Sequence, residues 1–144
     1  MLTGPADRSE RSSNAESSID RPHVLLIEDL EDVRVPNAAA LERAGYRVVQ
    51  ASSWGRALAL SERERLRVDV IVTDLLMPDD AGVDPFARLR RRHASVPVIV
   101  LSAYPAAMRL LDGVLDGVVE WLKKPTEVGH VVEAVGRALH RIGD

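Results

Sequence analysis

Short apolar segments recur along this chain, and polar or charged residues follow them directly. The clearest example is Val70-Ile71-Val72, which continues through Thr73 to a single carboxylate, Asp74. A short β-branched run without alternating polar residues is typical of a strand that is buried on both faces. Four other segments are predicted as strands, and helical patterns separate them: His23–Ile27 and residues 46–51, 96–101 and 118–122. This alternation predicts a parallel sheet with helices on both faces.

Five segments are predicted as helices: residues 32–44, 52 or 53 to 66, 84–93, 105–111, and a last helix capped by Thr126. Pro36 is compatible with the first helix only near its start, so we expect that helix to begin at about residue 32 or 33. Ser52 or Ser53 can cap the second helix. Right-handed crossovers favour the strand order 2-1-3-4-5, which is a doubly wound α/β fold.

Length and composition exclude several classes of protein. A chain of 144 residues suits one domain, and we place it at residues 22–144, after a polar, disordered tail at 1–21. The net charge of −3 gives no electrostatic case for binding nucleic acid. No apolar run approaches the ~18 residues that a membrane span needs, and the N-terminus lacks the apolar core of a signal peptide. The absence of cysteine excludes thiol chemistry and suits a reducing compartment, so a cytoplasmic protein is expected.

Polar side chains follow four of the predicted strands where each strand ends. Glu28 and Asp29 follow the first strand, Asp74 ends the third, and Ser102 and Lys124 follow the fourth and fifth. The carboxyl ends of parallel strands meet at one edge of the sheet, so these side chains should lie together. The edge would then carry three carboxylates, a hydroxyl and an ammonium group.

Three neighbouring carboxylates repel one another, and a hard divalent cation such as Mg²⁺ would relieve that repulsion. Mn²⁺ could take its place. A carboxylate beside Mg²⁺, with a lysine and a hydroxyl near it, is suited to attack phosphorus and form an aspartyl phosphate. The cation and Lys124 would stabilise the charge on the transferring phosphoryl group, and Ser102 could hydrogen-bond the attached phosphate.

Four sequence motifs resemble the receiver domain of bacterial two-component response regulators, the CheY-like family with a flavodoxin-like fold. They are I-E-D at 27–29, T-D-L-L-M-P at 73–78, L-S-A at 101–103 and W-L-K-K-P at 121–125. Single motifs of this kind are weak, but four in order on alternating strands are a strong signal. The resemblance extends from His23 to about Ile142.

The resemblance implies a role for each acidic residue of the predicted edge. Asp74 is the phosphoacceptor. Asp29 and Asp74 bind Mg²⁺ directly, together with the backbone carbonyl of Leu76, and Glu28 acts through a metal-bound water. Leu76 and Tyr104 stand where the family tunes the loss of phosphate, and because both are large we expect slow autodephosphorylation.

The resemblance also implies how the signal is transmitted. Lys124 contacts the phosphoryl group, Ser102 is the switch hydroxyl, and the Lys124-Pro125 bond is cis. Trp121 occupies the place of the aromatic switch, although a static core role is about as well supported. Trp54 is interpreted as a packing or surface residue.

We therefore expect a phosphoacceptor, not an enzyme in the usual sense, that takes its phosphoryl group from a histidine kinase or a histidine phosphotransfer protein. The fourth helix, fifth strand and fifth helix would contact a downstream protein, and a homodimer is left open. Whether the sequence is a single-domain regulator or a piece of a longer one is also open.

Two other functions were weighed. A receiver-like interaction module that is not phosphorylated would be expected to lose Asp29, Asp74 or Lys124. A phosphohydrolase with an aspartate nucleophile would need a second acid at position 76, which is Leu76 here.

Overall fold

The computed structural model describes residues 21–75, 84–103 and 117–143, the last three without their side chains. Five parallel strands form one sheet in the order β2-β1-β3-β4-β5, as predicted. The predicted tail, the helix at 105–111, Leu76 and Tyr104 lie outside the described residues. The strands are β1 (His23–Ile27), β2 (Arg47–Ala51), β3 (Val70–Asp74), β4 (Val98–Ser102) and β5 (Val118–Lys123).

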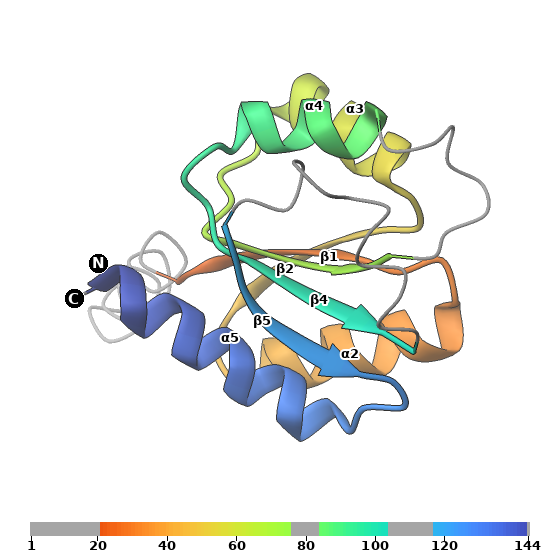
Figure 1. Ribbon diagram of the computed structural model, residues 1–144, viewed down its shortest axis with the longest axis vertical. Helices are drawn as coiled ribbons and strands as arrows, with labels where there is room; N and C mark the ends of the chain where they lie inside the picture. The colour runs from red at the N-terminus through yellow and green to blue at the C-terminus, as the bar shows by residue number, and fades with distance from the viewer. Residues whose placement is uncertain (1–20, 76–83, 104–116, 144) are drawn as a thin grey trace, which may run out of the picture.

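Four described helices cover the sheet on its two faces (Figure 1). Two of them, α3 (Trp54–Glu64) and α4 (Asp84–Arg92), pack against each other on one face. The other two, α2 (Glu31–Arg43) and α5 (Val128–Gly143), pack against each other on the opposite face. The sheet is therefore the middle layer of three, and its central strands are shielded from water on both sides.

Successive residues of the central strands enter opposite cores because side chains alternate across a strand. On the α3 and α4 side the buried residues include Leu25, Ile27, Ile71 and Phe86. The core on the α2 and α5 side is formed by other buried residues, among them Val24, Leu26, Val70, Val72, Val131 and Val135. All five residues of β3 and of β4 are buried, which explains why these strands read as continuous apolar runs.

Helix boundaries agree with prediction except in detail. Ser53 caps α3, since its side chain accepts a hydrogen bond from the backbone N–H of Arg56 at 3.0 Å. Helix α2 begins at Glu31 and therefore places Pro36 in its second turn. Proline has no N–H to donate to the backbone carbonyl four residues earlier. Pro36 is exposed, so water can bond that carbonyl instead.

The predicted cap of the last helix was wrong. Helix α5 begins at Val128, and the Thr126 hydroxyl instead donates a hydrogen bond to the Lys123 carbonyl at 2.5 Å. Thr126 is thus a turn residue of the connection that follows β5. The Lys124-Pro125 bond in this connection is cis, as predicted.

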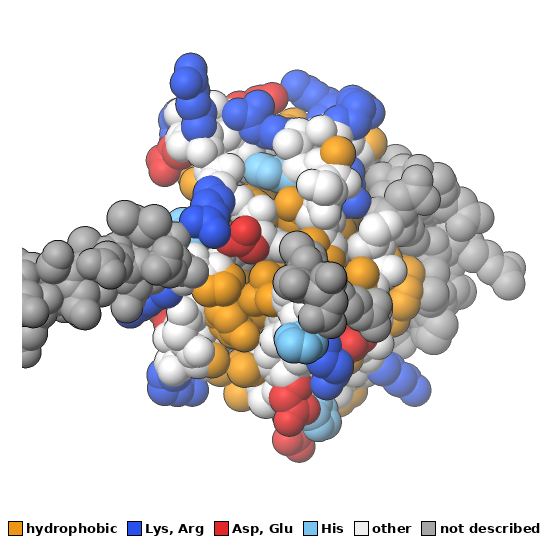
Figure 2. Space-filling view, turned by 90° about the vertical axis from the view of Figure 1, so that its left-hand side faces the viewer, with side chains coloured by type: hydrophobic (Ala, Val, Ile, Leu, Met, Phe, Trp, Pro, Cys, Tyr) orange, Lys and Arg blue, Asp and Glu red, His pale blue; other side chains and the backbone are white. Residues whose placement is uncertain are grey.

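Arginine side chains gather at the top of the molecule in Figure 2, where α3 and α4 lie. Arg88, Arg91 and Arg92 of α4 are exposed, in agreement with a solvated helix face. Arg90 differs, because its side chain turns back and donates hydrogen bonds to the carbonyls of Val96 at 2.8 Å and His93 at 3.0 Å. This arginine holds the connection between α4 and β4.

Candidate functional site

The carboxyl ends of the central strands lie at one edge of the sheet and carry the predicted polar residues. Glu28 directly follows β1, and Asp74 is the last residue of β3. Ser102 ends β4, where it pairs in register with Lys123 of β5, and Asp74 pairs with the residue before Ser102. Strands that are adjacent in space but distant in sequence thus deliver these side chains to one place.

Glu28, Asp29 and Asp74 form an acidic cluster at this edge. One carboxylate oxygen from each residue lies within 4.8 Å of the others. Glu28 is fully buried, Asp74 is nearly so, and Asp29 is half-buried. The first two carboxylates are therefore poorly hydrated and need compensating charge from the protein or from a cation.

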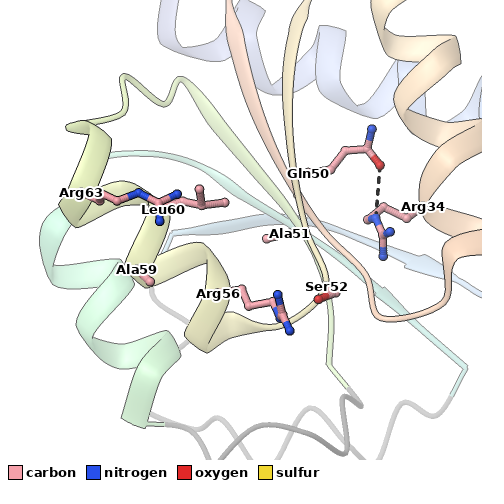
Figure 3. A pocket seen from close by; sticks show the side chains of 8 residues that line it. All are labelled: Arg34, Gln50, Ala51, Ser52, Arg56, Ala59, Leu60 and Arg63. Carbon is pink, nitrogen blue, oxygen red and sulfur yellow. Dashed lines mark hydrogen bonds between the residues drawn. The ribbon is translucent and has the colours of Figure 1, made fainter.

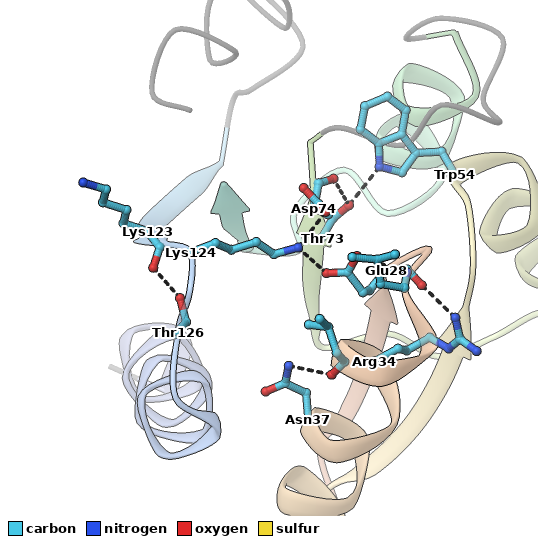
Figure 4. Close-up of polar contacts among 11 residues, drawn as sticks. Glu28, Arg34, Asn37, Trp54, Thr73, Asp74, Lys123, Lys124 and Thr126 are labelled. Carbon is cyan, nitrogen blue, oxygen red and sulfur yellow. Dashed lines mark hydrogen bonds and ion pairs between the residues drawn. The ribbon is translucent and has the colours of Figure 1, made fainter. Parts of the chain in front are cut away.

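Lys124 supplies part of that charge (Figure 4). Its ammonium nitrogen lies 2.5 Å from Glu28 Oε1 and 2.7 Å from Asp74 Oδ2, and donates a hydrogen bond to each. The Lys124 side chain is 17% exposed. Burial alone would lower the pKa of Lys124, but the hydrogen bonds to Asp74 and Glu28 outweigh it and hold the pKa above its ordinary value. Lys124 is accordingly a cation at neutral pH.

The charged form of Glu28 remains unfavourable even with this lysine beside it. Burial, which disfavours the charged form, and the neighbouring Asp74 carboxylate raise its pKa to about 7, although the hydrogen bond from Lys124 acts in the opposite direction. One ammonium group therefore does not fully neutralise the acidic cluster.

The acidic cluster fits a hard divalent cation. All three side chains are oxygen donors, they converge on one place, and they carry more negative charge than Lys124 offsets. The resemblance to receiver domains predicts a Mg²⁺ site at these same three residues. A bound Mg²⁺ would supply positive charge that the cluster lacks. The carbonyl of Leu76, which was predicted to join the site, lies outside the described residues.

Ser102 lies in β4, the strand next to that of Asp74, and Trp121 lies one strand further out, in β5. Ser102 is buried, and its carbonyl accepts a hydrogen bond from the backbone N–H of Lys124 at 3.0 Å, which ties β4 to the lysine. Trp121 lies in β5, half-buried, and packs against the core on the α3 and α4 side. Lys123 is exposed, as expected of the lysine that faces away from the site.

Two hydrogen bonds to the backbone of the acidic cluster, and a third that supports one of them, were not predicted from the sequence. Trp54 Nε1 donates to Thr73 Oγ1 at 2.8 Å, and the Thr73 hydroxyl donates to the Asp74 carbonyl at 2.8 Å. On the other side, Arg34 Nη1 donates to the Glu28 carbonyl at 2.8 Å. The one available signal was Thr73, a hydroxyl residue within an otherwise apolar run.

A separate hollow of about 370 Å³ lies at the outer edge of the sheet, between β2 and α3 (Figure 3). Arginines from two helices line it together with Gln50, which accepts a hydrogen bond from Arg34 Nε at 3.2 Å. None of the three acidic residues lines this hollow, so it is distinct from the acidic cluster.

Within the described part of the chain, no helix has both the length and the hydrophobicity that crossing a membrane requires.

Comparison with known proteins gives a family. A family model described as the response regulator receiver domain matches residues 24–136. The DNA-binding transcriptional regulator NtrC of Bradyrhizobium sp. is 32% identical over 119 residues, which are 81% of this chain and 24% of that protein. The transcriptional regulatory protein AfsQ1 of Streptomyces coelicolor is 33% identical over 123 residues, which are 85% of this chain and 53% of that protein. The chain thus spans about a quarter to a half of the length of these curated relatives.

Solved structures agree with this result. The chemotaxis protein CheY4 of Vibrio cholerae matches with a TM-score of 0.70 and 27% identity, over 83% of this chain and 99% of that one. A CheY-like receiver domain protein of Methanospirillum hungatei matches with a TM-score of 0.73 over 85% of this chain and 96% of that one, but at 18% identity it shows the fold alone. Since the family model covers most of the chain and the fold is the same, this protein belongs to the CheY-like response regulator receiver domains of two-component systems, which are signalling phosphoacceptors rather than classical enzymes.

Proposed function

We propose that this receiver domain accepts a phosphoryl group on Asp74 in a two-component phosphorelay, with Mg²⁺ as cofactor and Mn²⁺ as a substitute. The donor would be the phosphohistidine of a sensor histidine kinase or of a histidine phosphotransfer protein. The single observation that carries this proposal is the contact of Lys124 with Asp74 inside a cluster of three carboxylates. A lysine that is bound to a nearly buried carboxylate at the edge of the sheet is poised to meet a phosphoryl group there.

The transfer itself follows from these side chains. A carboxylate oxygen of Asp74 attacks phosphorus, the new O–P bond forms as the bond to the donor nitrogen breaks, and the donor imidazole leaves. Lys124 stays within reach of the transferred oxygens and stabilises their charge. Asp29 and Asp74 would hold the cation directly, with the Leu76 carbonyl, and Glu28 would act through a metal-bound water.

The signal is carried by the added charge, about −1.5 to −2 on a phosphorylated side chain. Ser102, in the strand next to Asp74, would hydrogen-bond the phosphate, and Trp121 would change its packing in response. A downstream protein would then contact the face that includes β5 and α5. Slow autodephosphorylation, expected because Leu76 and Tyr104 are large, is part of this proposal.

Incubation with acetyl phosphate and Mg²⁺, followed by intact-mass measurement, tests the proposal. We expect wild type to gain the mass of one phosphoryl group and Asp74→Asn to gain none. Chelation of Mg²⁺ should abolish the gain. An unmodified wild type that is folded and supplied with Mg²⁺ would instead favour an interaction module that is not phosphorylated.

A further inference from the structure

We propose that Trp54 is a positioning residue for the phosphorylation of Asp74, and that it acts through the hydroxyl of Thr73. The inference rests on the proposed function, because it concerns the geometry of the same phosphoacceptor. It assigns a role in the reaction to a tryptophan that lies in a different element, at the start of α3.

Two consecutive hydrogen bonds connect Trp54 to the backbone of the phosphoacceptor (Figure 4). The indole Nε1–H donates to Thr73 Oγ1 at 2.8 Å, and the Thr73 hydroxyl donates to the Asp74 carbonyl oxygen at 2.8 Å. An indole can only donate, so the threonine oxygen must be the acceptor of the first bond. The hydroxyl hydrogen is then free for the Asp74 carbonyl, and each bond favours the other.

This arrangement is closed to water. Thr73 is fully buried and Trp54 is only 4% exposed. Loss of the indole N–H would therefore leave a buried hydroxyl oxygen without this donor, and no solvent molecule could readily replace it.

The indole is itself held in place. Its ring packs on Phe86 of α4, with ring centroids 4.9 Å apart and an angle of 34° between the planes. On its N-terminal side Ser53 caps α3. The tryptophan is thus a rigid donor supported by two helices, and the strand that it contacts is β3.

The consequence is that Asp74 is held both by its side chain and by its main-chain carbonyl. Lys124 contacts the carboxylate oxygen Oδ2, and Thr73 contacts the main-chain carbonyl. Asp74 is the last residue of β3, and a rotation of the peptide group at its carbonyl would also shift the adjacent Cα, which carries the carboxylate side chain. Reactions that need close alignment of two groups lose rate when one of them is misplaced by about 1 Å.

A four-variant comparison of phosphorylation rates tests the inference. The variants are Trp54→Phe, which keeps an aromatic ring beside Phe86 but removes the N–H, Thr73→Val, which removes the hydroxyl, the double variant, and Thr73→Ser. The rate of Asp74 phosphorylation by acetyl phosphate is measured at saturating Mg²⁺ for several donor concentrations. Each of the first two variants should be slower by about 3- to 10-fold, the factor that one hydrogen bond typically contributes.

The double variant shows whether Trp54 and Thr73 affect the phosphorylation rate through one pair of consecutive hydrogen bonds or independently of each other. If Trp54 acts through Thr73, the double variant should be no slower than the slower single variant, and Thr73→Ser should react near the wild-type rate. Val49→Ala is the matched stability control, since Val49 packs against the same core as Trp54. It should lower the denaturant midpoint without slowing phosphorylation.

The outcomes distinguish this inference from the proposed function. If wild type itself gains no phosphate, the proposed function fails. If wild type is phosphorylated but Trp54→Phe reacts equally fast, only the role of Trp54 is overturned. A double variant whose slowing equals the product of the two single effects would also overturn it, as would a comparable slowing in Val49→Ala.

Discussion

The ammonium nitrogen of Lys124 lies 2.7 Å from Oδ2 of Asp74, and this contact joins residues that are 50 positions apart in the sequence. It places a permanent positive charge against a nearly buried carboxylate. The same nitrogen contacts Glu28, so one lysine pairs with acids at the ends of two strands. The stability of the domain and the chemistry that we propose for it therefore involve the same contact.

Replacement of Lys124 by glutamine should destabilise the domain when Mg²⁺ is absent. Two buried carboxylates would lose their cation, and we expect the free energy of unfolding at about pH 8 to fall by ~1–3 kcal/mol. Mg²⁺ should restore part of the loss, since a ligand that binds only the folded state stabilises it. Urea unfolding with and without Mg²⁺ measures both effects. Lys123→Gln, at the exposed neighbouring position, should change the free energy of unfolding by less than ~0.5 kcal/mol. An equal loss of unfolding free energy in both variants would contradict the prediction.

Arg34→Ala should weaken the support of Glu28. The variant removes the hydrogen bond to the Glu28 carbonyl and leaves that carbonyl to find another donor, at an expected cost of about 1–2 kcal/mol in the free energy of unfolding. Arg63→Ala provides the control, because Arg63 lines the same hollow but is largely exposed. Denaturant unfolding of the two variants side by side should show a clear difference, and indistinguishable curves would rule out this role of Arg34.

Gly117→Ala should destabilise the domain more than Gly45→Ala. Both glycines have positive φ, so alanine is strained at either position. At Gly117 an added Cβ would also meet Arg90 Nη2 at 2.5 Å, whereas at Gly45 it would meet nothing within 4 Å. Displacing Arg90 from the carbonyls to which it donates should lower the free energy of unfolding of Gly117→Ala by about 1 kcal/mol more. Thermal unfolding of the two variants tests this order, and the reverse order would show that Arg90 relaxes freely.

His93 should make stability depend on pH. Burial, followed by the charges of Arg92 and Arg90, holds the pKa of His93 below its ordinary value of 6.5. The unfolded chain then binds the proton more readily than the folded one. The contribution of the neutral imidazole is fully present above about pH 6.5 and is lost as the pH falls below that value towards the folded pKa.

The role of His93 is tested by measuring how far the free energy of unfolding falls between about pH 7.5 and about pH 5.5. His93→Gln should show a smaller fall than wild type. His130→Gln, at an exposed position of α5, should behave like wild type. If the fall is the same in wild type and both variants, other groups govern the pH dependence.

The sheet and the acidic cluster could be predicted because they follow from local patterns. Runs such as Val70-Ile71-Val72 are apolar on both sides, so they can only lie in the middle layer of the fold. Once the strands are parallel, their carboxyl ends must share an edge, and the residues found there follow from chain order alone. Chain order alone therefore predicts that Glu28, Asp74 and Lys124 lie together, and the hydrogen bonds of Lys124 show that they do.

Contacts that depend on how one layer packs on another could not be predicted. The sequence left open whether Trp54 is a packing or a surface residue, and nothing in it indicates that the indole N–H meets Thr73. Arg90 stands within a run of arginines, and nothing local distinguishes it from the solvated members. A threonine hydroxyl at this position can either cap the following helix or bond a carbonyl of the preceding turn. The sequence does not distinguish the two, and in the structure the Thr126 hydroxyl bonds the Lys123 carbonyl.

Chemical mapping of the phosphorylated residue tests the central claim most directly. The protein is treated with acetyl phosphate and Mg²⁺ and then with borohydride, which reduces an acyl phosphate to an alcohol, and its peptides are weighed. We predict that the reduced residue is Asp74 and that Asp74→Asn yields no reduced peptide. Reduction at Glu28 or Asp29 in the wild-type protein, or none at all while the folded protein binds Mg²⁺, would contradict the assignment of Asp74 as the phosphoacceptor.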